Sequence, residues 1–183
     1  KGRYDLGLQN YRAALATYEK VGAQAELLEA LHDSARLHLL LGDSASAEDD
    51  FRRALDLARS IGFDRGITLN LVALGDLEFR RKRTEAAVAF YEQARQRAAA
   101  AGVQHALALC LLRLARVNRS QHQIALASAA TDESLAIARK IGAPGLEAEA
   151  LFSRAELARV QKRFDRALAN YQAAESAQAH IGD

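Results

Sequence analysis

The chain has 183 residues, of which 25 are Lys or Arg and 23 are Asp or Glu, giving a formal net charge of +2. Half of the residues are hydrophobic and only one is Pro, a composition that favours an all-α protein. The near-balanced charge makes nucleic acid an unlikely partner and argues against an anionic membrane surface. No apolar run approaches the roughly 20 residues that cross a bilayer, so we expect a soluble, cytoplasmic protein.

Side chains suited to catalysis or metal binding are sparse. Cys110 is the only cysteine, which excludes an internal disulfide, and we interpret it as a small packing residue. The histidines contain no i, i+4 pair, and they are His32, His38, His105, His122 and His180. The sequence lacks a glycine-rich phosphate loop and a nucleophile elbow. We therefore predict no enzymatic activity, no cofactor and no metal site.

A glycine recurs every forty residues along the whole chain, at Gly22, Gly62, Gly102, Gly142 and Gly182. Each follows an aliphatic residue or Ala, as expected for a helix that ends in a left-handed glycine. Pro144, two residues after Gly142, fits the first turn of a new helix. The glycines therefore mark repeat boundaries in a single array.

The glycines divide the array into a half repeat at 1–22 and full repeats at 23–62, 63–102, 103–142 and 143–183. Because the chain opens within a repeat and closes just after Gly182, we expect it to be a fragment of a longer protein.

Each full repeat has two halves with helical spacing. The first half carries a constant leucine at Leu31, Leu71, Leu111 and Leu151. The second half carries a position between two small residues that is aromatic except at Thr131, and its residues are Tyr11, Phe51, Tyr91, Thr131 and Tyr171. Spacings of three and four residues place these side chains on one face of a helix. Each repeat is therefore predicted to be two antiparallel helices, A and B, of about 17 residues or roughly 25 Å each.

The segment Leu71-x-x-Leu74-Gly75-x-x-Glu78, followed by Ala87-x-x-x-Tyr91-x-x-Ala94, resembles the tetratricopeptide repeat (TPR). Segments such as 54–62 and 134–142 are similar to a long, 40-residue variant found in bacterial signalling ATPases, transcription activators and scaffold proteins. The resemblance implies a right-handed α-solenoid of antiparallel hairpins, with about 4.5 repeats. It also implies a non-catalytic scaffold that binds proteins, with A helices lining a concave groove for a peptide, a helix or an adjoining domain.

The resemblance assigns four groove positions to each A helix. They are Glu29, His32, Arg36 and Leu39; Leu69, Val72, Asp76 and Phe79; Leu109, Leu112, Arg116 and Arg119; and Glu149, Phe152, Glu156 and Arg159. The segment 107–114 is apolar on more than one face, which favours a docking groove. The alternative is that these side chains fill the inside of a tight superhelix or are covered by the rest of a longer protein.

One groove position alternates in charge, at Arg36, Asp76, Arg116 and Glu156. These side chains could orient a bound peptide. They could equally pair between neighbouring repeats, Arg36 with Asp76 and Arg116 with Glu156, and we favour this pairing.

Two further surfaces have competing interpretations. The run 80–83, Arg-Arg-Lys-Arg, could bind phosphate or an acidic partner together with Arg119, Lys162 and Arg163, but we favour a solvated turn at a helix end. Phe90, beside Val88, could form an exposed flank. This flank or the apolar groove could support self-association as a homodimer, which is our alternative to partner binding.

Overall fold

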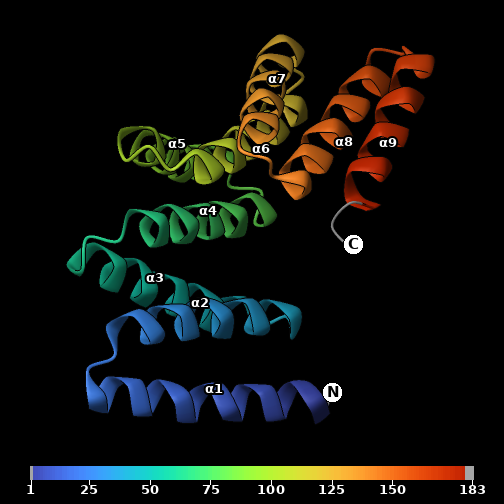
Figure 1. Ribbon diagram of the computed structural model, residues 1–183. Helices are drawn as coiled ribbons and strands as arrows, with labels where there is room; N and C mark the ends of the chain where they lie inside the picture. The colour runs from blue at the N-terminus through green and yellow to red at the C-terminus, as the bar shows by residue number, and fades with distance from the viewer. Residues whose placement is uncertain (1, 180–183) are drawn as a thin grey trace. The chain divides into compact units, whose positions relative to one another are not determined.

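The computed structural model describes the backbone of residues 2–179 and the side chains of residues 6–179. The expectations that concern His180 and Gly182 lie outside these residues. Nine α-helices and no strands occupy the described residues (Figure 1). They are α1 (Gly2–Val21), α2 (Gln24–Leu40), α3 (Ser44–Ser60), α4 (Asp64–Arg80), α5 (Thr84–Ala100), α6 (Gln104–Ser120), α7 (Ile124–Lys140), α8 (Pro144–Val160) and α9 (Phe164–Ala179).

The helices keep the forty-residue interval of the sequence. The A helices α2, α4, α6 and α8 begin at residues 24, 64, 104 and 144, and each has 17 residues. Each B helix follows its A helix after a turn of three residues. The all-α prediction and the predicted helix lengths are confirmed.

The predicted glycine turns are also confirmed. Gly22, Gly62, Gly102 and Gly142 have φ values of 71°, 68°, 68° and 61°, in the left-handed region where glycine carries no Cβ penalty. At the start of α3 the Asp43 side chain accepts a hydrogen bond from the Ser46 amide at 3.0 Å, which caps the helix.

A second left-handed position lies in the turns from A to B helices. Gly42 occupies it once, with φ of 83°, but Lys82, His122 and Lys162 occupy it with φ of 61°, 60° and 59°. Sequence analysis missed these three because long side chains rarely adopt this conformation. The geometry of the repeat imposes it.

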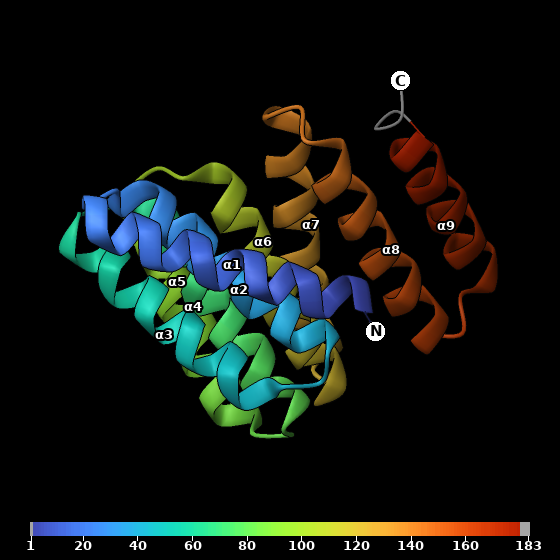
Figure 2. The same cartoon turned by 90° about the horizontal axis from the view of Figure 1, so that it is seen from below.

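The chain divides into two compact units, Lys1–Phe90 and Tyr91–Asp183, with the boundary inside α5. In the first unit α1, α2, α3 and α4 pack consecutively, each on the next. In the second unit α6, α7, α8 and α9 do the same, and α6 also contacts α8. The α8–α9 hairpin is seen side by side in both Figure 1 and Figure 2.

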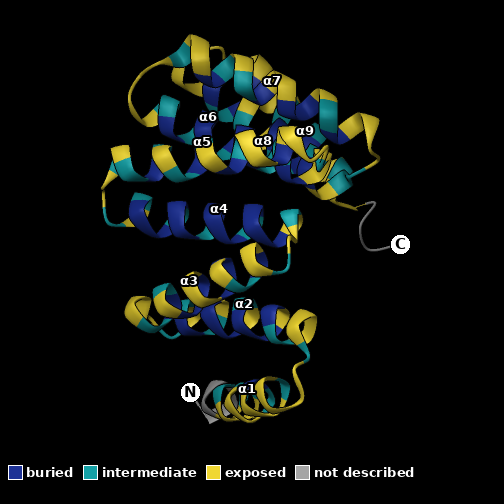
Figure 3. Ribbon diagram, turned by 90° about the vertical axis from the view of Figure 1, so that its left-hand side faces the viewer, coloured by how far each residue is buried: buried dark blue, intermediate teal, exposed yellow. Residues whose placement is uncertain are grey.

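The core follows the predicted columns. The constant leucines of the A helices are at most 5% exposed. Phe51 and Tyr91 are 1% and 0% exposed, and each lies between alanines that are fully buried. Close packing of a ring between small residues explains the small, aromatic, small pattern. Figure 3 shows α4 largely buried and much of α9 exposed.

None of the helices in the described part of the chain combines the length and the apolar character needed to cross a membrane.

Candidate functional site

In the first unit, three predicted groove residues come together between α2 and α4. Glu29, His32 and Leu69 line a hollow of about 260 Å³. Its remaining walls are Leu28, Asp33, Phe63, Arg65, Gly66 and Asn70. Leu28, Leu69 and Phe63 supply apolar surface, while Glu29, Asp33 and Arg65 add charges of both signs. A hollow of this kind can hold one apolar side chain of a partner and orient it by charge.

His32 is held in place by residues from two neighbouring helices. Its Nδ1 lies 3.0 Å from Oδ1 of Asn70, and its ring meets Phe51 edge-on with centroids 5.3 Å apart. Asn70 is itself anchored, because its Nδ2 donates to the carbonyl of Gly66 at 2.9 Å. The wall formed by His32 and Asn70 is therefore preorganised.

Gly66 leaves room for the side chains of Phe63 and Leu28, which both line this hollow. A Cβ at residue 66 would lie 2.7 Å from Cδ1 of Phe63 and 3.3 Å from Cδ1 of Leu28. The site thus depends on a glycine that sequence analysis did not single out. The sequence could have indicated this glycine, because the equivalent positions in the other repeats carry side chains, at Glu26, Ala106 and Leu146.

The other predicted groove residues of the first unit are dispersed. Arg36 is exposed, and Leu39, Asp76 and Phe79 are half-buried. Val72 is only 3% exposed, so its side chain belongs to the core. The prediction that Val72 offers a docking surface is therefore wrong.

In the second unit, predicted groove residues form ion pairs that join α6 to α8. Arg119 donates to Glu156 at 2.6 Å, and Arg113 donates to Glu149. Glu156 also accepts from Arg159 at 2.8 Å. Arg116, which is half-buried, donates to the hydroxyl of Tyr91 at 3.1 Å.

Glu156 is the centre of this network. Hydrogen bonds from Arg159, from the Tyr171 hydroxyl and from Arg119 lower the pKa of its carboxyl group to about 2. Glu156 therefore stays ionised and holds α8 against α6 and α9. It has a structural role in addition to any contact with a partner.

The favoured pairing of the alternating charges is wrong. Arg36 pairs with Asp33 on its own helix at 3.7 Å, and Glu156 pairs with Arg119 and Arg159 in place of Arg116. An arginine side chain is long enough to reach across about one helical turn. The carboxylate of Glu156 therefore pairs with Arg119, about one turn away from the predicted partner Arg116.

The position shared by His32, Val72, Leu112 and Phe152 differs in burial from repeat to repeat. Leu112 is 3% exposed and belongs to a core cluster of α6, α7, α8 and α9, so its predicted docking role is also wrong. Phe152, at the same position in α8, is 53% exposed. Its ring meets Tyr171 edge-on with centroids 5.5 Å apart.

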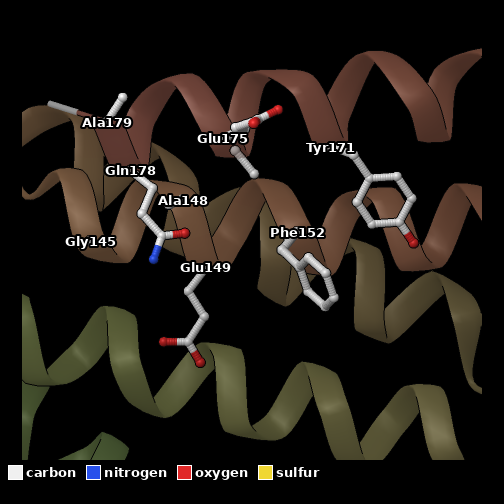
Figure 4. Close-up of a pocket in the computed structure, with 9 residues that line it drawn as sticks. Gly145, Ala148, Glu149, Phe152, Tyr171, Glu175, Gln178 and Ala179 are labelled. Atoms are coloured by element: carbon white, nitrogen blue, oxygen red, sulfur yellow. The ribbon is translucent and has the colours of Figure 1, made fainter. Parts of the chain in front are cut away.

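Phe152 lines a hollow of about 790 Å³ between α8 and α9 (Figure 4). The lining residues are Gly145, Ala148, Glu149 and Phe152 of α8, and Tyr171, Ala174, Glu175, Gln178 and Ala179 of α9. Among them, only Glu149 and Phe152 were predicted as groove residues. Glu175 could have indicated this hollow, because the equivalent positions in α1, α3 and α7 are the leucines Leu15, Leu55 and Leu135.

Two of the four cations in the basic run at 80–83, Arg81 and Arg83, form ion pairs. Arg81 donates to Glu48 at 2.5 Å and to Glu78 at 2.9 Å, and Arg83 pairs with Glu78 at 3.4 Å. These pairs favour the interpretation as a helix-end turn. Phe90 and Val88 are half-buried, and self-association through this flank stays a prediction.

Cys110 is fully buried, and burial raises the pKa of its thiol to about 12. It packs as a small residue, as predicted. Within the described residues there is no group of three or more His, Cys, Asp or Glu side chains that could hold a metal ion.

The comparisons with known proteins find a family match over the first third of the chain and a shared fold over nearly all of it. The tetratricopeptide repeat family model matches residues 1–60. No curated protein matches the chain in sequence. The chain is similar to the crystal structure of BtubC from P. vanneervenii, with 16% identity and a TM-score of 0.77, over 99% of this chain and 75% of that one.

Two further solved structures share the fold. Aspartyl phosphate phosphatase F from Bacillus subtilis is 14% identical with a TM-score of 0.76, over 97% of this chain and 56% of that one. A Podosopora anserina protein named as a kinesin light chain, with nearly identical TPR-like repeats, is 14% identical with a TM-score of 0.68, over 99% and 89% of the two chains. At these identities the likeness concerns the fold.

Proposed function

Because the chain folds as a TPR-like repeat protein, we propose that it is a non-catalytic scaffold whose A helices bind a segment of a partner protein. The partner is a peptide, a helix or an adjoining domain of the same chain, and the binding has a regulatory role. The observation that carries this proposal is the α2–α4 hollow, which is lined by three of the predicted groove residues, Glu29, Leu69 and the preorganised His32.

The composition of the hollow suits a short protein segment. Leu69 and Phe63, which is 43% exposed, provide a place for an apolar side chain, and the charges of Glu29 and Arg65 flank it. An apolar anchor within a polar rim is the usual arrangement of a peptide site. The hollow is small, so one anchoring side chain fits it better than a drug-sized ligand does.

A displayed peptide library provides a direct test. Peptides selected on the wild-type protein should bind the Leu69→Lys variant at least about tenfold more weakly, a loss of about 1.4 kcal/mol, because a lysine puts a charge beside the apolar wall. Binding is measured by fluorescence anisotropy with each selected peptide.

The matched control is Leu126→Lys, which makes the same change at a leucine that is 57% exposed on α7. Both variants are checked for unchanged thermal unfolding. If the selected peptides bind the folded Leu69→Lys variant as tightly as the wild type, the binding site lies elsewhere and the proposal fails.

A further inference from the structure

An ion-pair network in the first unit joins α3 to the end of α4 and to the turn that follows α4. Arg81 donates to Glu48 at 2.5 Å and to Glu78 at 2.9 Å. Arg83 pairs with Glu78 at 3.4 Å. The two carboxylates therefore compensate the charges of the arginines at this edge of the repeat.

The same four positions recur eighty residues later, in the second unit. Their residues are Ser128, Ala158, Gln161 and Arg163, and all four line a hollow of about 380 Å³ formed by α7, α8 and α9. At this hollow, which we call the α7–α9 hollow, both carboxylates of the network are absent and one arginine is retained. The hollow is therefore the counterpart of the network without its acidic side chains.

The walls of the α7–α9 hollow carry more positive than negative charge. Its lining includes three arginines, Arg154, Arg163 and Arg166, but one carboxylate, Asp132, which lies 3.4 Å from Arg154. Arg166 stands where α5 has Ala86, so it adds a cation to this position of the repeat. Arg163 and Arg166 are exposed, and their guanidinium groups have no ion-pair partner among the described residues.

The edge that carries these two arginines stays exposed where another hairpin follows. Gln123 and Leu126 of the α6–α7 hairpin correspond to Arg163 and Arg166. Gln123 is exposed and Leu126 is 57% exposed, although α8 and α9 come after them in the same unit. Because packing of the next hairpin leaves these positions uncovered, the hollow owes its accessibility to the residues in its own walls.

The lining favours a carboxylate over other anions. Guanidinium groups bind carboxylates and phosphates through charge-assisted hydrogen bonds. Glu48 and Glu78 show that a carboxylate fits this position of the repeat, since both pair with Arg81. The negative charge of Asp132 in the wall disfavours a doubly charged phosphate more strongly than a singly charged carboxylate.

We propose that the α7–α9 hollow binds the carboxylate of a Glu or Asp side chain in an acidic segment of a partner protein. Arg163 and Arg166 supply the positive charge, and the bound carboxylate takes the place that Glu48 and Glu78 occupy in the first unit. The α7–α9 hollow shares no lining residue with the α2–α4 hollow, so either proposal can fail without the other.

A dye-labelled hexaglutamate peptide is a suitable probe. Its affinity for the full chain, measured by fluorescence anisotropy, should fall about three- to tenfold when Arg163→Gln and Arg166→Gln are combined, which is the effect of losing two exposed ion pairs. The matched control combines Arg12→Gln and Arg80→Gln, which remove the same charge at two exposed arginines without ion pairs in the described chain. The control should change the affinity by less than about twofold.

A carboxylate placed inside the hollow provides the converse test. Ser128→Glu introduces an acidic side chain at the position of Glu48. It should weaken hexaglutamate binding about as much as the two arginine substitutions, because the new carboxylate competes for the same cations. Ala136→Glu is the control, since it adds the same charge at an exposed residue of α7 that does not line the hollow. Thermal unfolding checks that each variant is folded.

Four outcomes would overturn the proposal. Hexaglutamate that does not bind the wild-type chain at millimolar concentration is the first. Equal losses in the arginine pair and its control are the second, because they would show attraction to net charge alone. The third is tighter binding of a phosphoserine peptide of equal net charge, which would assign the hollow to phosphate. The fourth is a homodimer in light scattering that the arginine pair dissociates, which would make a second copy the occupant.

Discussion

The α6–α7 and α8–α9 hairpins present equivalent surfaces, but only the first is covered by a helix in the described chain. The helix α8 buries Leu112 in the core, whereas Phe152, at the same repeat position, is 53% exposed. Repeat geometry therefore provides a seat for an A helix at each hairpin, and the residues that follow decide whether it belongs to the core or to the surface.

The largest difference is expected at the aromatic position of the B helices. Tyr91→Ala should lower the free energy of unfolding by about 3 to 5 kcal/mol, because Tyr91 is fully buried between alanines. Tyr171→Ala, at the same repeat position but half-buried, should cost clearly less. Urea unfolding measures both. A loss below about 1 kcal/mol for Tyr91→Ala would show that the packing face is wrong.

The two seats can be compared directly by truncating one residue in each. Leu112→Ala should cost about 2 to 5 kcal/mol, because it opens a cavity beneath α8. Phe152→Ala should lose only the edge-on contact with Tyr171 and some surface, about 0.5 to 1.5 kcal/mol. Thermal unfolding of both variants tests this order. Equal losses would mean that the α8–α9 seat is as well packed as the filled one.

The two left-handed turn positions should respond in opposite directions. Gly142→Ala should lower the free energy of unfolding by about 1 to 2 kcal/mol, because the left-handed backbone conformation is strained for alanine. No steric clash adds to this cost, because an added Cβ would meet no atom within 4 Å. Lys162→Gly removes the strain of the left-handed conformation, but glycine also increases the conformational entropy of the unfolded chain. The free energy of unfolding should therefore rise by less than about 1 kcal/mol. Destabilisation by Lys162→Gly in calorimetry would show that the lysine makes a compensating contact.

The ion pairs that join α8 to α6 and α9 should give an effect that depends on pH. Since Glu156 has its pKa lowered from 4.5 to about 2, its contribution to stability is present above its unfolded pKa and is lost as pH falls from about 4.5 toward 2. The stability difference between wild type and Glu156→Gln should therefore shrink over this interval. Glu175→Gln is the control, because Glu175 makes no such hydrogen bonds in the described chain. A difference that is constant with pH would contradict the network.

Much of the fold follows from local sequence. The forty-residue glycine interval, the constant leucines and the small, aromatic, small pattern predicted the helices, their lengths and the buried rings of Phe51 and Tyr91. Each of these signals acts within one or two helical turns, where spacing in the sequence and position on a helix face are directly related. The left-handed conformation of Lys82, His122 and Lys162 was not predictable in this way, because the turn imposes it against the preference of the residues.

The candidate sites depended on contacts between helices, which local patterns do not specify. The resemblance to the tetratricopeptide repeat assigned Glu29, His32 and Leu69 to a common groove, and the structure brings them to one hollow between α2 and α4. It also assigned Val72, Leu112 and Phe152 to the same groove, although neighbouring helices bury the first two and leave the third exposed. By itself, the sequence determined which residues share a helix face. Only the tertiary structure decided which face is covered, because burial depends on the helix that packs against it.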